Sequence, residues 1–152
     1  MNRKLDIFVA TMTGTALIVA DEIVEVCEEK NIAASIKEFD NINYSCLVNQ
    51  QNPILVISST YGQGDVPDGS KSFYEKLKNN KPNLDHIEFA VFGLGDMTYK
   101  DTFAFGGKKF EELLSSLNAV KIVDSCFHDA SAGTLPEEEA VIWFKEKVLT
   151  AL

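Results

Sequence analysis

Three short segments of the sequence carry residue types that could bind a phosphorylated, planar molecule. The first segment contains three threonines and one glycine but no Lys or Arg. Hydroxyls, the free N–H groups at the start of a helix and the positive end of the helix dipole together bind anions. We therefore expect a monophosphate held by neutral donors, although an ordinary threonine-rich helix cap would have the same composition. Its residues are Thr11, Met12, Thr13, Gly14, Thr15 and Ala16.

The second and third segments each combine glycines with one tyrosine. Glycine lets the backbone approach a flat ligand closely, and a tyrosine from each segment could stack on a ring system. Alternatively, the two tyrosines simply cover the end of the sheet. The second segment is Ser59, Thr60, Tyr61, Gly62, Gln63, Gly64 and Asp65, and the third is Gly93, Leu94, Gly95, Asp96, Met97, Thr98 and Tyr99.

The elements that must position these segments follow from the hydrophobic pattern. Apolar runs alternate with helical patterns along the whole chain, which predicts an α/β fold with a parallel sheet. The runs at 5–10, 54–57 and 87–92 are almost entirely apolar, as central strands are, whereas 34–37 and 120–122 alternate like edge strands. We predict a doubly wound, five-stranded parallel sheet in the order 2-1-3-4-5, with helices on both faces.

This order brings the three segments together. They follow strands one, three and four, whose carboxyl ends meet where the winding direction reverses, and ligands bind at that point in such sheets. The chain is 152 residues long and has no linker or repeat. We therefore expect a single domain over residues 1–152.

Composition excludes several kinds of function. With 23 acidic and 14 basic residues the net charge is −9, which argues against nucleic acid and indicates either a basic protein partner or simply solubility. The three cysteines form no metal-binding pattern, and free thiols favour a cytoplasmic location. No run approaches the roughly 20 apolar residues of a membrane span. His86 and His128 lack a neighbouring nucleophile pattern and are expected at the surface.

The sequence resembles the flavodoxins over essentially its whole length. It is most similar to short standalone members whose loops match the FMN-binding half of diflavin reductases and of the sulfite reductase flavoprotein. The matching strings are Thr13-Gly14-Thr15-Ala16, Ser59-Thr60-Tyr61-Gly62-Gln63-Gly64-Asp65, and Phe92-Gly93-Leu94-Gly95-Asp96 with Thr98-Tyr99.

The resemblance implies a role for each segment. Residues 11–16 would hold the FMN phosphate, and Tyr61 and Tyr99 would cover opposite faces of the isoalloxazine ring. The backbone at Gly62 would respond to reduction of the flavin. The segment 94–103, including Phe103, would line the ring edge, and Asp129 would lie near the flavin.

The sequence departs from the common family pattern in two places. The stretch 100–107 is one residue longer than the usual spacing, and the last strand lacks the insertion of about 20 residues that marks long-chain members. Near the site, Asp65, Asp68, Asp96 and Asp101 would disfavour an added negative charge on the flavin. The resemblance and these carboxylates together imply a low-potential, short-chain protein.

The function implied is an FMN-containing electron carrier without catalytic residues or a substrate of its own. As a monomer, it would take single electrons from an NAD(P)H-dependent reductase with a basic face and pass them to an acceptor enzyme. The alternative is a freestanding FMN-dependent quinone or nitro reductase. A phosphorylated signalling domain would need an aspartate where Ser58, Ser59 and Thr60 end strand three. A flavin-free binding module would leave the three-segment match unexplained.

Overall fold

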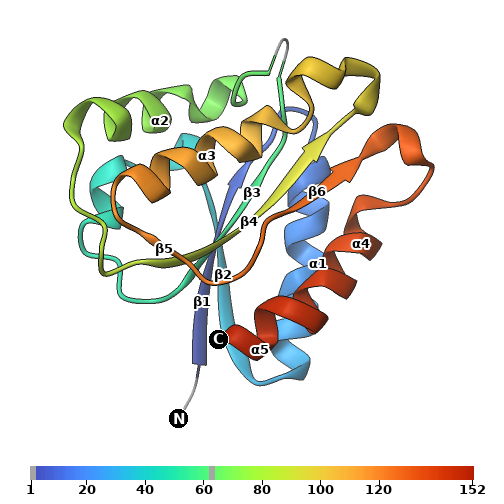
Figure 1. Cartoon of the computed structure of the whole chain (residues 1–152). Helices are drawn as coiled ribbons and strands as arrows, with labels where there is room; N and C mark the ends of the chain where they lie inside the picture. Colours follow the sequence, from blue (N-terminus) through green and yellow to red (C-terminus); the bar gives the residue numbers. More distant parts are fainter. Residues whose placement is uncertain (1–2, 62–63) are drawn as a thin grey trace.

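The strands form one parallel sheet in the order β2-β1-β3-β4-β5, with β6 also paired to β4 (Figure 1). The computed structural model describes residues 3–61 and 64–152, with Tyr99 and Lys100 described by their backbone alone. The strand order and the α/β class predicted from the sequence are confirmed. The strands are β1 (Arg3–Ala10), β2 (Ile32–Glu38), β3 (Ile54–Ser58), β4 (Glu88–Gly95), β5 (Val120–Lys121) and β6 (Cys126–Asp129).

Burial along the strands explains their positions. All five residues of β3 are buried, and so are six consecutive residues in each of β1 and β4. Such strands must be covered on both faces, which suits the centre of a parallel sheet. In β2 the buried and exposed residues partly alternate, as expected for an edge.

The fifth position of the sheet is filled by two short segments in succession. β5 pairs with the start of β4 at Glu88 and Phe89, and β6 pairs with its end from Phe92 to Gly95. Between them the chain leaves the ladder, and the indole N–H of Trp143 donates to the carbonyl of Asp124 at 3.2 Å. The expected strand at 120–122 therefore resumes as β6, which carries His128 and Asp129 to the carboxyl edge of the sheet.

Helices cover both faces of the sheet, as predicted. The helices α1 (Thr15–Glu29) and α4 (Pro136–Trp143) pack on one face over Ile7 and its neighbours, and the chain ends in α5 (Leu149–Ala151) after a π-helical turn. The helices α2 (Asp68–Asn80) and α3 (Phe105–Ser116) pack on the other face over Phe8. Between β2 and β3 the chain forms two short 3₁₀ helices, Phe39–Asn41 and Tyr44–Leu47.

One carboxylate is buried within this framework, near the start of β1. Asp6 is 6% exposed and accepts hydrogen bonds from Gln50 Nε2 at 2.6 Å and Ser35 Oγ at 2.9 Å. Asn52 Nδ2 lies 3.3 Å away, and Lys37 Nζ lies 3.7 Å from the same carboxylate. Burial raises the pKa of Asp6, but these four partners outweigh burial and lower the pKa below its usual range. The ionised carboxylate thus ties β1 to β2 and to the segment before β3.

Candidate functional site

A cavity of about 560 Å³ opens at the carboxyl edge of the sheet. Its volume lies within the range of roughly 300–1,000 Å³ that is typical of small-molecule sites. Residues from all three predicted segments line it, so the topology does bring them together. The lining residues are Met12, Thr13, Ser59, Thr60, Tyr61, Leu94, Gly95, Asp96, Thr102 and Ala104.

A second cavity, of about 630 Å³, lies between the carboxyl-terminal ends of α2 and α3. Lys78, Lys81 and Glu112 are among its lining residues, and none of its lining residues comes from the three segments. The carboxyl ends of helices repel anions. The cavity at the sheet edge is therefore the better candidate for a phosphorylated ligand.

The first segment forms a tight turn into α1. Gly14 has φ +94° and caps the helix, and its N–H donates to Thr11 Oγ1 at 2.9 Å. Thr13 Oγ1 and Thr15 Oγ1 lie 3.4 Å apart, beside the N–H groups of the first turn, which have no partner within the helix. The first turn of α1 has no acidic residue that would repel an anion. This donor set fits a phosphate group. Ala16 is fully buried on the core side, so only its backbone could take part.

The second segment is fixed at both ends by hydrogen bonds. Thr60 Oγ1 donates to the carbonyl of Leu94 at 2.9 Å and accepts from the N–H of Gly106 at 3.0 Å, so it links β4 and α3. Tyr61 and Asp65 exchange two backbone hydrogen bonds of 2.8 Å. Tyr61 is 42% exposed and lines the cavity.

Two glycines of this segment were predicted in the site. Gly62 lies outside the described residues. Gly64 has φ +94° and is buried against α3, since a Cβ there would lie 2.8 Å from Phe105 Cδ2. Gly64 therefore supports the loop from behind.

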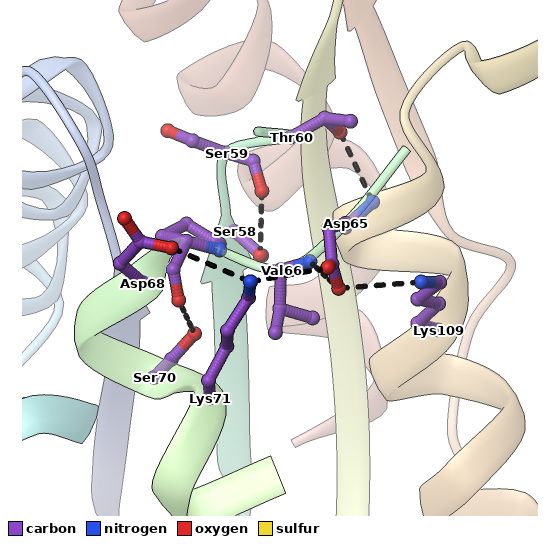
Figure 2. Close-up of polar contacts among 11 residues, drawn as sticks. Ser58, Ser59, Thr60, Asp65, Val66, Asp68, Ser70, Lys71 and Lys109 are labelled. Carbon is purple, nitrogen blue, oxygen red and sulfur yellow. Dashed lines mark hydrogen bonds and ion pairs between the residues drawn. The ribbon is translucent and has the colours of Figure 1, made fainter. Parts of the chain in front are cut away.

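Asp65 is held between two lysines, as Figure 2 shows. Lys109 Nζ from α3 lies 3.3 Å and Lys71 Nζ from α2 lies 3.4 Å from its carboxylate oxygens. Burial raises the pKa of Asp65, but the N–H of Val66 and the two lysines lower it overall. The negative charge expected here from the sequence is therefore balanced by two cations. Lys71 also lies 3.5 Å from Asp68.

Asp96 is the carboxylate that faces the cavity. Its Oδ1 accepts a hydrogen bond from the N–H of Thr98 at 2.8 Å, and no cation pairs with it among the described residues. Asp101 is exposed and does not line the cavity. Of the four aspartates considered in the sequence, Asp96 thus carries the unbalanced charge at the site.

The third segment is supported by β6. Asp129 Oδ1 accepts from the N–H of Met97 at 2.9 Å and from Ser131 N–H and Oγ at 2.9 and 2.7 Å. The hydrogen bond from Met97 is the main cause of the lowered pKa of Asp129. Asp129 therefore positions the segment without lining the cavity. Thr98 is exposed, and the side chain of Tyr99 lies outside the described part of the structure.

His128, next to Asp129, differs from the sequence expectation. It is only 2% exposed, and its Nε2 lies 3.0 Å from both the carbonyl oxygen and Oγ1 of Thr134. The expectation that it lies at the surface was wrong, because the turn after β6 folds back and supplies polar partners. The other histidine, His86, is exposed as expected.

The stretch after Tyr99 contributes two lining residues: Thr102, which lies within the expected segment 94–103, and Ala104, which lies just beyond it and was not expected from the sequence. They flank Phe103, whose ring lies against the backbone of Gly95, 3.0 Å from where a Cβ would stand. Ala104 has φ +55°, which is unusual for alanine and has no signature in the sequence. Gly93, predicted in the site, is covered by Phe127 and lies under the cavity wall.

The described residues contain no group of three or more His, Cys, Asp or Glu side chains placed to hold a metal ion. Within the same described ranges, no helix combines the length and apolar content needed to cross a bilayer. Exposed Met12 and Tyr61, at 40% and 42%, instead give the cavity apolar contact surface. Together with the donors at 11–15, they suit a ligand that is flat and apolar at one end and anionic at the other.

Comparison with known proteins agrees with this chemistry. The flavodoxin family model matches residues 7–143. Flavodoxin YqcA of Escherichia coli (strain K12) is 32% identical over 143 residues, covering 94% of this chain and 95% of the relative. NADPH-dependent diflavin oxidoreductase 1 of Arabidopsis thaliana is 36% identical over 130 residues, which cover 84% of this chain and 21% of that protein.

Solved structures give the same result. A cysteine-to-serine mutant of flavodoxin from Pseudomonas aeruginosa superposes with a TM-score of 0.85 at 29% identity and covers 98% of both chains. The sequence and structural relatives therefore agree over nearly the full length of this chain. The chain belongs to the flavodoxin family, whose members bind FMN and transfer electrons.

Proposed function

We propose that the protein is an electron carrier that binds FMN in the cavity at the carboxyl edge of the sheet and exchanges single electrons with partner proteins. The observation that carries the proposal is one cavity lined by three loops, with neutral anion donors at one end and exposed Tyr61 and Met12 beside it. Bound FMN would supply the one-electron chemistry.

The chain's own residues would hold and tune the cofactor. The hydroxyls of Thr11, Thr13 and Thr15 and the N–H groups of the α1 start would bind the phosphate. Tyr61 would stack on one face of the ring, and we keep Tyr99 as the candidate for the other face. The further proposed contacts are Gly62, Leu94, Gly95, Asp96 and Thr98, with Ser59, Thr60, Gly64, Gly93, Phe103 and Asp129 supporting the loops.

Asp96 would lower the reduction potential of the bound FMN. Its negative charge at the cavity wall, which has no cation partner among the described side chains, disfavours an added negative charge on the bound ring. This supports a low reduction potential, which suits a protein that donates electrons.

We further propose that the electron donor is an NAD(P)H-dependent flavoprotein reductase with a basic face and that the acceptor is a separate redox enzyme. The net charge of −9 would steer association with a basic partner. The diflavin oxidoreductase relative, described as NADPH-dependent, supports this donor class. We infer a monomeric, single domain over 1–152, and the three free thiols support a cytoplasmic location.

The phosphate assignment can be tested by Thr13→Ala combined with Thr15→Ala. Hydrogen bonds to a charged group contribute roughly 1.5–3 kcal/mol each, so losing two should weaken FMN binding on the order of 100-fold or more. FMN fluorescence titration measures the affinity, and Thr150→Ala, at the other end of the chain, is the control. Unchanged affinity in the double variant would reject the assignment.

The carrier role can be tested in a reconstituted assay with NADPH, a basic NADPH-dependent flavoprotein reductase and cytochrome c. We expect cytochrome c reduction to need all components and to slow as ionic strength rises, because charge steers the encounter. Rapid oxidation of NADPH by the purified protein alone would instead favour a freestanding quinone or nitro reductase.

A further inference from the structure

Lys108 lies at the centre of an aromatic cluster beside the cavity. Its Nζ is 5.3 Å from the ring centre of Phe103, 5.5 Å from that of Phe105 and 5.4 Å from that of Phe127. A cation within about 6 Å of a ring centre is attracted by the electrons of the ring face. No ion pair of Lys108 is present within residues 3–61 and 64–152. The three rings are therefore the groups that face its charge.

Each ring of this cluster lies against a glycine of the second or third segment. A Cβ at Gly95 would lie 3.0 Å from Phe103 Cδ1, and one at Gly64 would lie 2.8 Å from Phe105 Cδ2. At Gly93 the distance to Phe127 Cδ1 would be 2.6 Å. Two of the rings thus rest on the backbone of β4 and the third rests on the backbone of the second segment.

The three rings belong to different structural elements, although Phe103 and Phe105 are close in sequence. Phe103 follows a 3₁₀ helix, Phe105 begins α3, and Phe127 belongs to β6. Each ring packs against a different glycine, whereas one ammonium group lies over all three rings at once. Gly95 lines the cavity, and Gly64 and Gly93 belong to the segments whose other residues line it, so a shift of the rings would change the shape of the site.

We propose that Lys108 is a positioning residue whose ammonium group holds the three rings against the glycines of the second and third segments and so keeps the site in its flavin-binding shape. This inference rests on the proposed function, because the cavity must be the flavin site. Lys108 would act only through the rings and would make no contact with FMN.

The contact between Lys108 and the rings can be tested in the cofactor-free protein by NMR. Ring currents should shift the ε-methylene protons of Lys108 upfield from the position of an exposed lysine, for which Lys76 on α2 is the reference. Ordinary chemical shifts for Lys108 would overturn the proposal, whether or not the protein binds FMN.

The functional effect can be tested with Lys108→Met, Lys108→Arg and the control Lys76→Met. Methionine keeps the apolar stem and removes the charge, whereas arginine keeps a cation that stacks on rings. We expect Lys108→Met to weaken FMN binding about 10-fold, equivalent to about 1.4 kcal/mol, and Lys108→Arg to stay within about twofold of the natural protein. Lys76→Met should bind normally.

Two results of this titration would overturn the inference. One is normal FMN affinity in Lys108→Met, and the other is an equal loss in Lys108→Arg, since the charge would then not matter. Thermal unfolding of each cofactor-free variant shows that it is folded, and if Lys108→Met fails to fold, the Lys108→Arg result and the NMR shifts still decide. Failure of the natural protein to bind FMN would instead refute the proposed function.

Discussion

Among the described glycines, Gly106, the second residue of α3, is the one where an added methyl group would clash most closely. A Cβ there would lie 2.0 Å from the backbone oxygen of Ser59 and 3.2 Å from Ser58 Oγ. Carbon–oxygen contacts normally need about 3.3 Å or more, so Gly106→Ala must push α3 and the second segment apart by about 1.3 Å. The clash is with backbone, so no side-chain rotation relieves it.

The cost of this movement can be estimated from the contacts that it breaks. The N–H of Gly106 donates to Thr60 Oγ1 at 3.0 Å, and that hydroxyl donates to the carbonyl of Leu94 at 2.9 Å. Two hydrogen bonds contribute about 1 kcal/mol each, and overpacking costs about 1–3 kcal/mol. The better helix propensity of alanine returns at most about 1 kcal/mol. We expect a net loss of about 2–4 kcal/mol in the free energy of unfolding.

Gly69→Ala is the matched control, because Gly69 is also the second residue of a helix, α2. A Cβ there would meet only the side chain of Asp40, at 3.1 Å. Urea unfolding and thermal unfolding measure both variants. At roughly 2–4 °C per kcal/mol, we expect Gly106→Ala to lower the Tm by about 5–15 °C and also to weaken FMN binding, while Gly69→Ala changes the Tm by a few degrees at most. Equal stability of the two variants would refute the reasoning.

Two further predictions concern charge. The folded-state pKa of Asp6 is lowered, so its ionised form stabilises the protein above the unfolded-state pKa and this contribution is lost as the pH falls through the folded-state value. Urea unfolding should therefore give Asp6→Asn a lower free energy of unfolding than the natural protein at pH 7. The difference in free energy between the two proteins should shrink towards pH 3, and a difference that stays constant with pH would contradict this. Asp96→Asn should raise the midpoint potential of bound FMN. For a carboxylate roughly 8 Å from the flavin ring at an effective dielectric of ~20, the repulsion of an added negative charge is about 2 kcal/mol. For one electron this corresponds to a potential change on the order of 90 mV before screening by salt. Asp85→Asn, at the amino end of the sheet, is the control, and an unchanged or lower potential in Asp96→Asn would count against the assignment.

The strand order could be predicted because a strand that is covered on both faces of the sheet consists almost entirely of apolar residues. The segment 54–57 is a continuous apolar run because both faces of β3 are covered, and β2 partly alternates because it lies at an edge. The continuation of the fifth strand could not be predicted. β6 contains Cys126, His128 and Asp129, and the burial of His128 depends on Thr134, which folds back after the strand.

The site, too, could be predicted from the sequence only in part. The segments at the strand ends could be located because the topology fixes which strand ends meet, and the cavity does form there. In contrast, side-chain contacts between residues of different helices and strands leave no local pattern in the sequence. The lysines that balance Asp65 come from α2 and α3, and Ala104, whose backbone is left-handed, packs over Gly95 of β4.

The visible absorption spectrum of the purified protein tests the central claim most directly. If the three loops hold FMN between them, the protein should show flavin bands as isolated or after incubation with one equivalent of FMN, and these bands should stay with the protein through gel filtration. A colourless protein that takes up no added FMN would contradict the account, even if its fold is the one described.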